Sequence, residues 1–213
     1  MKLIVLDTET TNSLDDPFMY DIGYIVTDEK GEVFLSRSFV IEEVFLDKEL
    51  MESAYFAEKR PQYWEDIEKG KRVLAPLKNI RSQLAEDCKK YGISIISAHN
   101  ALFDYKAMQG TQRYLTCSKY RWFIPFGIEI WDSLKMARKA FGKDKNYITF
   151  CTENNYLTQY KKPKFTAEIL YRYIINDNSF IESHTGLEDV MIEKVIFSEC
   201  YKRGIVDGKL WDE

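Results

Sequence analysis

The chain has 213 residues, of which 45% are apolar and 30% charged, and this composition excludes disordered and fibrous proteins. No apolar run approaches the roughly 18 residues of a membrane span, and the apolar start of MKLIVLDTET is too short for a signal peptide. We therefore expect one cytoplasmic domain covering residues 1–213, large enough to bury a core around a sheet.

The net charge of −4 hides an uneven distribution along the chain. Residues 1–104 carry a net −7, residues 105–175 a net +8 and residues 176–213 a net −5. A basic middle between acidic ends is typical of a protein that binds a polyanion and holds cations elsewhere. On charge alone, however, a solvated basic surface is the favoured interpretation. The basic residues concerned are Lys135, Arg138, Lys139, Lys143, Lys145, Lys161, Lys162 and Lys164.

The first half of the chain predicts strands followed by a helix. Residues 2–8 are almost continuously apolar, as in a strand that is buried on both faces. Residues 20–41 hold two runs of β-branched and aromatic residues joined through DEKGE, which predicts a hairpin. Apolar residues at helical spacing then predict a helix over 73–91, ended by Gly92, and a short strand over 93–100.

The second half alternates between helices and a strand. A strand is predicted near 128–131, and helices near 101–114, 133–141, 147–156, 165–175 and 186–203. Three leading strands followed by alternating elements indicate an α/β fold with a mixed sheet flanked by helices. The four cysteines are far apart, with no C-x-x-C pair, so we expect reduced and mostly buried thiols.

Acidic residues follow two of the predicted strands. Asp7 and Glu9 lie two apart at the end of the first strand, so both side chains should leave the same face, opposite Thr8. Asp104 lies about one turn into the helix after the strand, within SAHNALFD. Because sites in open sheets gather at the carboxyl ends of strands, these carboxylates can converge. His99 in that stretch is a candidate ligand, although a structural role is the more common one.

The stretch HTGLEDV, residues 184–190, has the pattern of a helix start. Thr185 and Glu188 have the spacing of a capping box. This leaves His184 and Asp189 unexplained, unless the histidine lies on the preceding loop and the aspartate faces inward. Four carboxylates and one histidine would suit magnesium or manganese, and histidine can accept a proton near neutral pH.

In these residues the sequence resembles the DEDDh family of 3′–5′ exonucleases, which includes polymerase proofreading subunits. The family motifs occur in order as DTETT (7–11), AHNALFD (98–104) and HTGLED (184–189). The resemblance implies a ribonuclease-H-like α/β fold, with a mixed five-stranded sheet of an antiparallel hairpin plus parallel strands, flanked by helices. Two residues depart from the family pattern. Asn12 replaces a glycine, and Gly186 replaces an alanine, which would loosen the loop that carries His184.

The resemblance also implies an activity and a site. The activity is metal-dependent hydrolysis of single-stranded nucleic acid, DNA in preference, from the 3′ end to nucleoside monophosphates. Two Mg²⁺ or Mn²⁺ ions would be held by the catalytic carboxylates of Asp7, Glu9, Asp104 and Asp189. His184 would be the general base. The candidate substrate contacts are Thr10, Thr11, Asn100 and Phe103, with core packing as the alternative for Phe103.

Other interpretations of the sequence stay open. The enzyme could trim RNA, since only contacts to a 2′-hydroxyl separate the two sugars. A non-catalytic module of the same fold could instead bind nucleic acid or a DNA polymerase, in replication or repair. Asp132 is expected to cap a helix. The stretch KYRWFIPFG (119–127) has the composition of a surface that stacks unpaired bases, with burial of Trp122 and Phe123 as the equal alternative.

Overall fold

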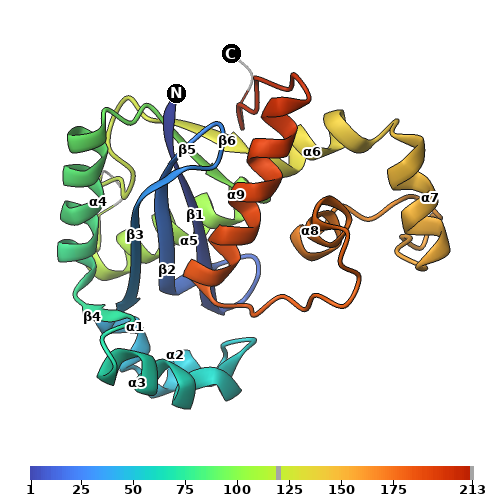
Figure 1. The fold of residues 1–213 in the computed structure, drawn as a ribbon. Helices are drawn as coiled ribbons and strands as arrows, with labels where there is room; N and C mark the ends of the chain where they lie inside the picture. Colours follow the sequence, from blue (N-terminus) through green and yellow to red (C-terminus); the bar gives the residue numbers. More distant parts are fainter. Residues whose placement is uncertain (119–120, 212–213) are drawn as a thin grey trace.

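A six-stranded mixed sheet is the centre of the fold in this computed structural model, which describes residues 1–118 and 121–211 (Figure 1). The strand order is β4-β3-β2-β1-β5-β6. β1, β2 and β3 are antiparallel neighbours, whereas β4, β5 and β6 each join in parallel. The predicted α/β fold class is confirmed, with one strand more than the five expected. The strands are β1 (Lys2–Asn12), β2 (Pro17–Asp28), β3 (Val33–Ile41), β4 (Val73–Ala75), β5 (Ile95–Ala98) and β6 (Glu129–Asp132).

Helices cover both faces of this sheet. The last five begin and end within three residues of the predicted bounds, whereas those between β3 and β4 were not predicted individually. The helices are α1 (Glu42–Phe45), α2 (Lys48–Glu52), the 3₁₀ turn η1 (Ala57–Lys59), α3 (Arg60–Glu68), α4 (Leu77–Tyr91), α5 (Ala101–Thr116), α6 (Ser133–Phe141), α7 (Lys145–Glu153), α8 (Ala167–Ile175) and α9 (Gly186–Lys202). Over the described ranges, no helix combines the length and the apolar character that a membrane crossing needs.

Alternation along β1 divides the core into two clusters. Leu3 and Val5 pack in the cluster that includes residues of α6, α7, α8 and α9. Ile4 and Leu6 point the other way, into the cluster built with α4 and α5. Figure 1 shows α9 crossing the front of the sheet, with α5 behind it. The predicted burial of this strand on both faces is therefore confirmed.

The predicted helix over 73–91 is wrong at its start. Val73–Ala75 form the edge strand β4, which pairs in parallel with β3. Pro76 follows in an extended conformation and the helix begins at Leu77, because the residue before a proline is driven out of the helical region. The predicted end is correct, since Gly92 closes α4 with a φ of 65°.

β1 is longer than predicted and carries the candidate site inside it. The strand runs to Asn12 and pairs with β2 along its whole length, across an irregularity after Glu9. Asn12 has a φ of 67°, the left-handed conformation expected where asparagine replaces glycine. Asp7 and Glu9 therefore project from the middle of a rigid strand rather than from its end.

The cysteine expectation is confirmed. Cys88, Cys151 and Cys200 are buried, Cys117 is exposed, and all four are free thiols.

Candidate active site

Three acidic side chains from distant parts of the sequence lie together on one face of the sheet. Asp7 and Glu9 leave β1 on the face that α9 covers, as do Leu3 and Val5. Asp189 comes from the first turn of α9. One carboxylate oxygen from each of the three lies within 4.8 Å of the others. A divalent cation, which takes several oxygen ligands at about 2.0–2.6 Å, fits this spacing.

Asp104, the fourth predicted carboxylate, lies outside that group of three. It is buried in the first turn of α5. Its Oδ1 accepts hydrogen bonds from the backbone N–H of Thr8, at 3.1 Å, and from the Thr8 hydroxyl, at 2.8 Å. Asp104 thus approaches β1 on the side of Thr8. The charge of Asp104 nevertheless affects the group of three. The pKa of Asp7 is raised first by burial, then by the negative charge of Glu193 and then by that of Asp104.

Burial raises the pKa of every carboxyl in this cluster. Burial, reinforced by the charge of Asp21, raises the pKa of Glu9 to about 8. Burial also raises the pKa of Asp104 to about 7 and that of Asp189 to about 7. Crowded buried carboxylates resist ionisation unless a cation offsets their charge. The chemistry of this donor set, hard oxygens with an excess of negative charge, fits a divalent cation such as Mg²⁺ or Mn²⁺.

These shifts predict how stability depends on pH when no metal is bound. Because the folded-state pKa values lie above the ordinary 3.8 of Asp and 4.5 of Glu, the folded protein binds more protons than the unfolded one. Its free energy of unfolding should therefore be highest near pH 4–5 and fall as the pH rises towards about 8. Urea unfolding in chelator across this range measures the slope. Saturating Mn²⁺ should reduce this dependence of the free energy of unfolding on pH. The same dependence with and without Mn²⁺ would contradict the cation site.

Glu193 is a fifth carboxylate, which no sequence motif indicated. It lies four residues after Asp189 on α9 and is 4% exposed, so it faces the same way from the next turn. Its Oε2 accepts the backbone N–H of His99 at 3.1 Å. Burial raises its pKa, with further increases from Asp104 and Asp189. A glutamate on an otherwise buried helix face was the signal that could have revealed it.

We predict that Glu193→Gln weakens cation binding by roughly 10–100-fold, the range found when groups that support metal ligands are changed. The glutamine oxygen can still accept the His99 N–H, so the substitution removes chiefly the negative charge. Calorimetric titration with Mn²⁺ measures the affinity, and urea unfolding in chelator should show a more stable metal-free protein. If the Mn²⁺ affinity is unchanged, Glu193 only accepts the hydrogen bond from His99 and does not support cation binding.

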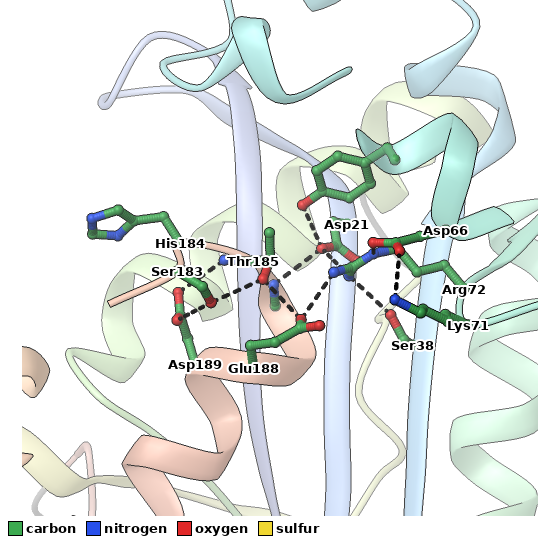
Figure 2. Close-up of polar contacts among 12 residues, drawn as sticks. Asp21, Ser38, Asp66, Lys71, Arg72, Ser183, His184, Thr185, Glu188 and Asp189 are labelled. Carbon is green, nitrogen blue, oxygen red and sulfur yellow. Dashed lines mark hydrogen bonds and ion pairs between the residues drawn. The ribbon is translucent and has the colours of Figure 1, made fainter. Parts of the chain in front are cut away.

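His184 lies on the loop before α9, as predicted, but outside the carboxylate group. Its backbone is left-handed, with a φ of 51°. Its ring stacks on Phe56 at 4.7 Å between centroids and 12° between planes, and extends away from α9 (Figure 2). The Lys59 ammonium donates to the carbonyl oxygens of Ser183 and His184. Phe56 and Lys59, from the segment between β3 and β4, therefore hold the loop, and no sequence motif pointed to them.

The predicted substrate contacts have different environments. Thr11 is buried, and its hydroxyl hydrogen bonds with the Leu50 carbonyl and the Ser53 hydroxyl, so it ties β1 to α2. Thr10 and Phe103 are half-buried and Asn100 is exposed, which leaves these three accessible to a ligand.

His99 and Asp132 have the structural roles that were favoured for them. The two ring nitrogens of His99 hydrogen bond with the Ser133 hydroxyl, at 2.9 Å, and with the Phe165 carbonyl, at 2.8 Å. Asp132 caps α6 by accepting the N–H of Leu134 at 2.9 Å.

The capping box predicted at the start of α9 is wrong in its bonds, although Thr185 is the N-cap residue. The Thr185 hydroxyl donates to Glu188 Oε2 at 2.8 Å instead of accepting a backbone N–H. The backbone N–H of Thr185 donates to Asp189 Oδ2 at 3.1 Å. Glu188 does not reach back because Arg72 binds its Oε2 at 2.9 Å. The turn that carries the candidate ligand Asp189 is thus fastened through Arg72 to β2 and β3, on the face of the sheet that α9 covers.

Arg72 is the centre of a buried network that joins β2, β3, α3 and α9 (Figure 2). Its guanidinium is 2% exposed and donates to Asp21, Asp66, Ser38 and Glu188. Asp21, fully buried, also accepts from the Tyr63 hydroxyl and from the backbone N–H of Gly186. Burial raises the pKa of Asp21, and Arg72 acts against that increase.

We predict that Arg72→Met lowers the free energy of unfolding by about 3–5 kcal/mol, because it leaves the buried carboxylate of Asp21 without its cation. Urea unfolding measures the loss. Lys69→Met removes a cation from an exposed pair with Glu65 and should leave the free energy of unfolding almost unchanged. If Arg72→Met and Lys69→Met have equally small effects on the free energy of unfolding, the network around Arg72 does not stabilise the fold.

Two glycines let α9 approach the sheet closely at this point. A Cβ on Gly23 of β2 would lie 2.2 Å from the backbone nitrogen of Leu187, and one on Gly186 would lie 2.8 Å from the nitrogen of Gly23. The role of Gly186 is therefore close packing of the helix start, which corrects the interpretation that it loosens the His184 loop.

A basic cavity of about 810 Å³ opens beside the site. Its lining includes Asn100 and His99, from the junction of β5 and α5, and the cations Arg138, Lys162 and Lys164. These three cations belong to the basic middle of the sequence. A polyanion that enters the site can therefore contact positive charge immediately beyond the carboxylates.

Trp122 and Phe123 of KYRWFIPFG have different environments in the structure, where residues 119 and 120 lie outside the described part of the chain. Phe123 is fully buried and Trp122 is 51% exposed. Trp122 lines a cavity with residues of α4, α5 and β6, and its indole faces the Arg113 guanidinium at 5.8 Å. This cavity is on the face of the sheet opposite to Asp7 and Glu9, so Trp122 does not belong to the carboxylate site.

Comparison with known proteins shows a shared fold without a close relative in sequence. No protein-family model matches the chain, and no curated protein sequence matches it. Among solved structures, the zinc-bound exonuclease I complex with single-stranded DNA from E. coli is similar at a TM-score of 0.59 and 17% identity, over 95% of this chain and 40% of that one. Exonuclease I from Methylocaldum szegediense is similar at a TM-score of 0.58 and 14% identity, over 95% and 40%.

A third similar structure is E. coli exonuclease I with a dA16 oligonucleotide, at a TM-score of 0.55 and 16% identity over 91% of this chain and 39% of that one. The chain thus spans about 40% of the length of the exonuclease I chains that it matches. At these identities the similarity is one of fold.

Proposed function

We propose that this protein is a divalent-metal-dependent 3′–5′ exonuclease that hydrolyses single-stranded nucleic acid, DNA in preference, to nucleoside monophosphates. The observation that carries the proposal is the convergence of Asp7, Glu9 and Asp189 within 4.8 Å in a buried, negatively charged setting. The shared fold with exonuclease I structures, one of them a complex with single-stranded DNA, supports the nuclease class.

Asp7, Glu9, Asp189 and Asp104 would hold the cations, with Glu193 adding negative charge behind them. The chemistry that two divalent cations supply when bound is stabilisation of the attacking and leaving oxygens of an in-line displacement at phosphorus. The raised pKa values of these carboxyls result from burial and from the crowding of negative charge, which bound cations would offset.

His184 would accept the proton of the attacking water. Its side chain is 43% exposed, so water reaches the ring. Burial, followed by the charge of Lys59, lowers its pKa below the ordinary value of 6.5, so the imidazole is neutral at physiological pH and can take a proton. The cavity cations Arg138, Lys162 and Lys164 would bind the phosphates of the strand behind the terminal nucleotide.

Digestion of matched single-stranded DNA and RNA oligonucleotides, each labelled at either the 3′ or the 5′ end, tests the proposal. With Mg²⁺, labelled mononucleotide should be released at once from the 3′-labelled strands and late from the 5′-labelled ones, and chelator should stop both. Comparison of the two sugars decides between the preferred deoxyribonuclease and an exoribonuclease. Release from internal positions or from the 5′ end would overturn the proposed polarity.

A further inference from the structure

A second cavity, of about 590 Å³, lies on the face of the sheet covered by α4 and α5. Trp122 and Trp211, each 51% exposed, and Phe126, wholly exposed, are among its walls. Tyr105 meets Trp211 edge to face at 4.8 Å between ring centroids. Asp7, Glu9 and Asp189 of the candidate active site face α9 on the other side of the sheet, whereas Asp104 lies on α5, where it is buried and bonded to Thr8. The cavity is therefore a separate feature, and binding of a ligand in it does not depend on the proposed exonuclease activity.

A buried amide in this cavity lacks a hydrogen-bond partner. Gln109 of α5 lines the cavity and is 3% exposed. Its Oε1 accepts the backbone N–H of Phe123 at 3.2 Å, but its Nε2 is buried and makes no hydrogen bond within residues 1–118 and 121–211. Buried polar groups are nearly always paired. The unpaired donor is enclosed, so an acceptor on a ligand reaches it once the Gln109 side chain turns towards the cavity that it lines.

The charge of the lining is positive in a protein that is acidic overall. Arg81 and Arg121 line the cavity, and none of the other described residues in its walls is acidic. Arg81 is anchored by its Nε to the carbonyl of Trp122 at 2.7 Å. Flat, exposed aromatic surface, guanidinium groups and a hydrogen-bond donor are together the features with which proteins bind unpaired bases and their phosphates.

We infer that this cavity binds one nucleotide unit of a single-stranded nucleic acid or a free nucleoside monophosphate. The base stacks on Trp122, the Gln109 side chain turns to donate a hydrogen bond to it, and the phosphate lies by Arg121. The volume is within the range of small-molecule sites, about 300–1,000 Å³. An acidic peptide is the less favoured occupant, because its acidic side chains have no aromatic ring that could stack on Trp122.

Tryptophan fluorescence of the full chain in chelator tests the inference, since hydrolysis is then prevented. Titration with AMP should quench the fluorescence and reach saturation, whereas ribose 5-phosphate, which has the phosphate and sugar without the base, should not. Trp122→Ala should weaken AMP binding by roughly 5- to 150-fold, the effect of removing one stacked base. Arg121→Ala, an exposed change that leaves the aromatic walls in place, should also weaken it.

Trp64→Ala is the matched control. Trp64 is 37% exposed and lies beside Arg60 in a hollow that also contains Glu65 and Glu68. This hollow, like the cavity, has a tryptophan and an arginine, but its two glutamates mean that its lining is not positively charged. AMP affinity should be unchanged in this variant. No saturable quenching at millimolar AMP, equal affinity for ribose 5-phosphate, or undiminished AMP binding by Trp122→Ala and Arg121→Ala would overturn the inference. Tighter binding of an acidic aromatic peptide than of AMP would overturn it in favour of a protein partner.

Discussion

Asp7→Asn should abolish hydrolysis, with a rate at least about 10³-fold below that of the unmodified chain. The carboxylate is central to the group with Glu9 and Asp189, and asparagine replaces a charged ligand by a neutral one. Several kcal/mol of transition-state stabilisation depend on the cations, and each 1.4 kcal/mol is worth about tenfold in rate. Release of mononucleotide from a 3′-labelled oligonucleotide in Mg²⁺ measures the effect.

A second readout for Asp7→Asn does not depend on activity. In chelator the variant should be more stable than the unmodified chain, because it removes one of several buried like charges. We expect Mn²⁺ to raise the melting temperature of the unmodified chain, and this rise should largely disappear in Asp7→Asn. Asp87→Asn is the control, since Asp87 is a buried aspartate of α4 that accepts from Tyr24 and Arg37, and it should retain activity. Full activity in Asp7→Asn would contradict the metal site.

His184→Ala should lower turnover by roughly 10²–10⁴-fold, the usual contribution of a general base, while Mn²⁺ binding persists. His184 is outside the carboxylate group and stacks on Phe56, so its removal leaves the cation ligands in place. Single-turnover kinetics and calorimetry measure the two effects separately. An unchanged rate would refute the assignment of His184 as the base.

The pH profile gives the matching control for His184. Because a base must be neutral, the rate of the unmodified chain should fall as the pH drops through the lowered pKa of His184. Lys59→Met removes a positive charge that contributes to the lowering, so the acidic limb should move to higher pH. His184→Ala should lose that limb, and a limb that persists unchanged in it would assign the titration to another group.

The convergence of the acidic side chains could be predicted from local rules, whereas their surroundings could not. Asp7 and Glu9 lie on one face because strand residues alternate, and the bounds of α9 followed from helical periodicity. Glu193 was missed because a glutamate in a helix has no motif of its own until the buried face is known. The bonds of Thr185 could not be foreseen because Arg72, 113 residues earlier, binds its expected partner.

The misplaced boundaries have the same cause. Val73–Ala75 fit a helical pattern of apolar residues, yet they pair with β3, and only the tertiary contact decides between the two. Gly23 and Gly186 are ordinary glycines in the sequence, and their close approach becomes apparent only when β2 and α9 are brought together. Spacing along the chain thus predicted that Asp7, Glu9 and Asp189 come together, and non-local packing determines how they are held.

Hydrolysis of a 3′-labelled single-stranded oligonucleotide in oxygen-18 water, followed by mass spectrometry of the products, tests the central claim most directly. If Asp7, Glu9, Asp104 and Asp189 hold cations that promote attack of water on the terminal phosphodiester, each released nucleoside 5′-monophosphate should carry one oxygen-18 atom in its phosphate. Absence of mononucleotide release in both Mg²⁺ and Mn²⁺, or release of nucleotides whose phosphate carries no label, would contradict the account.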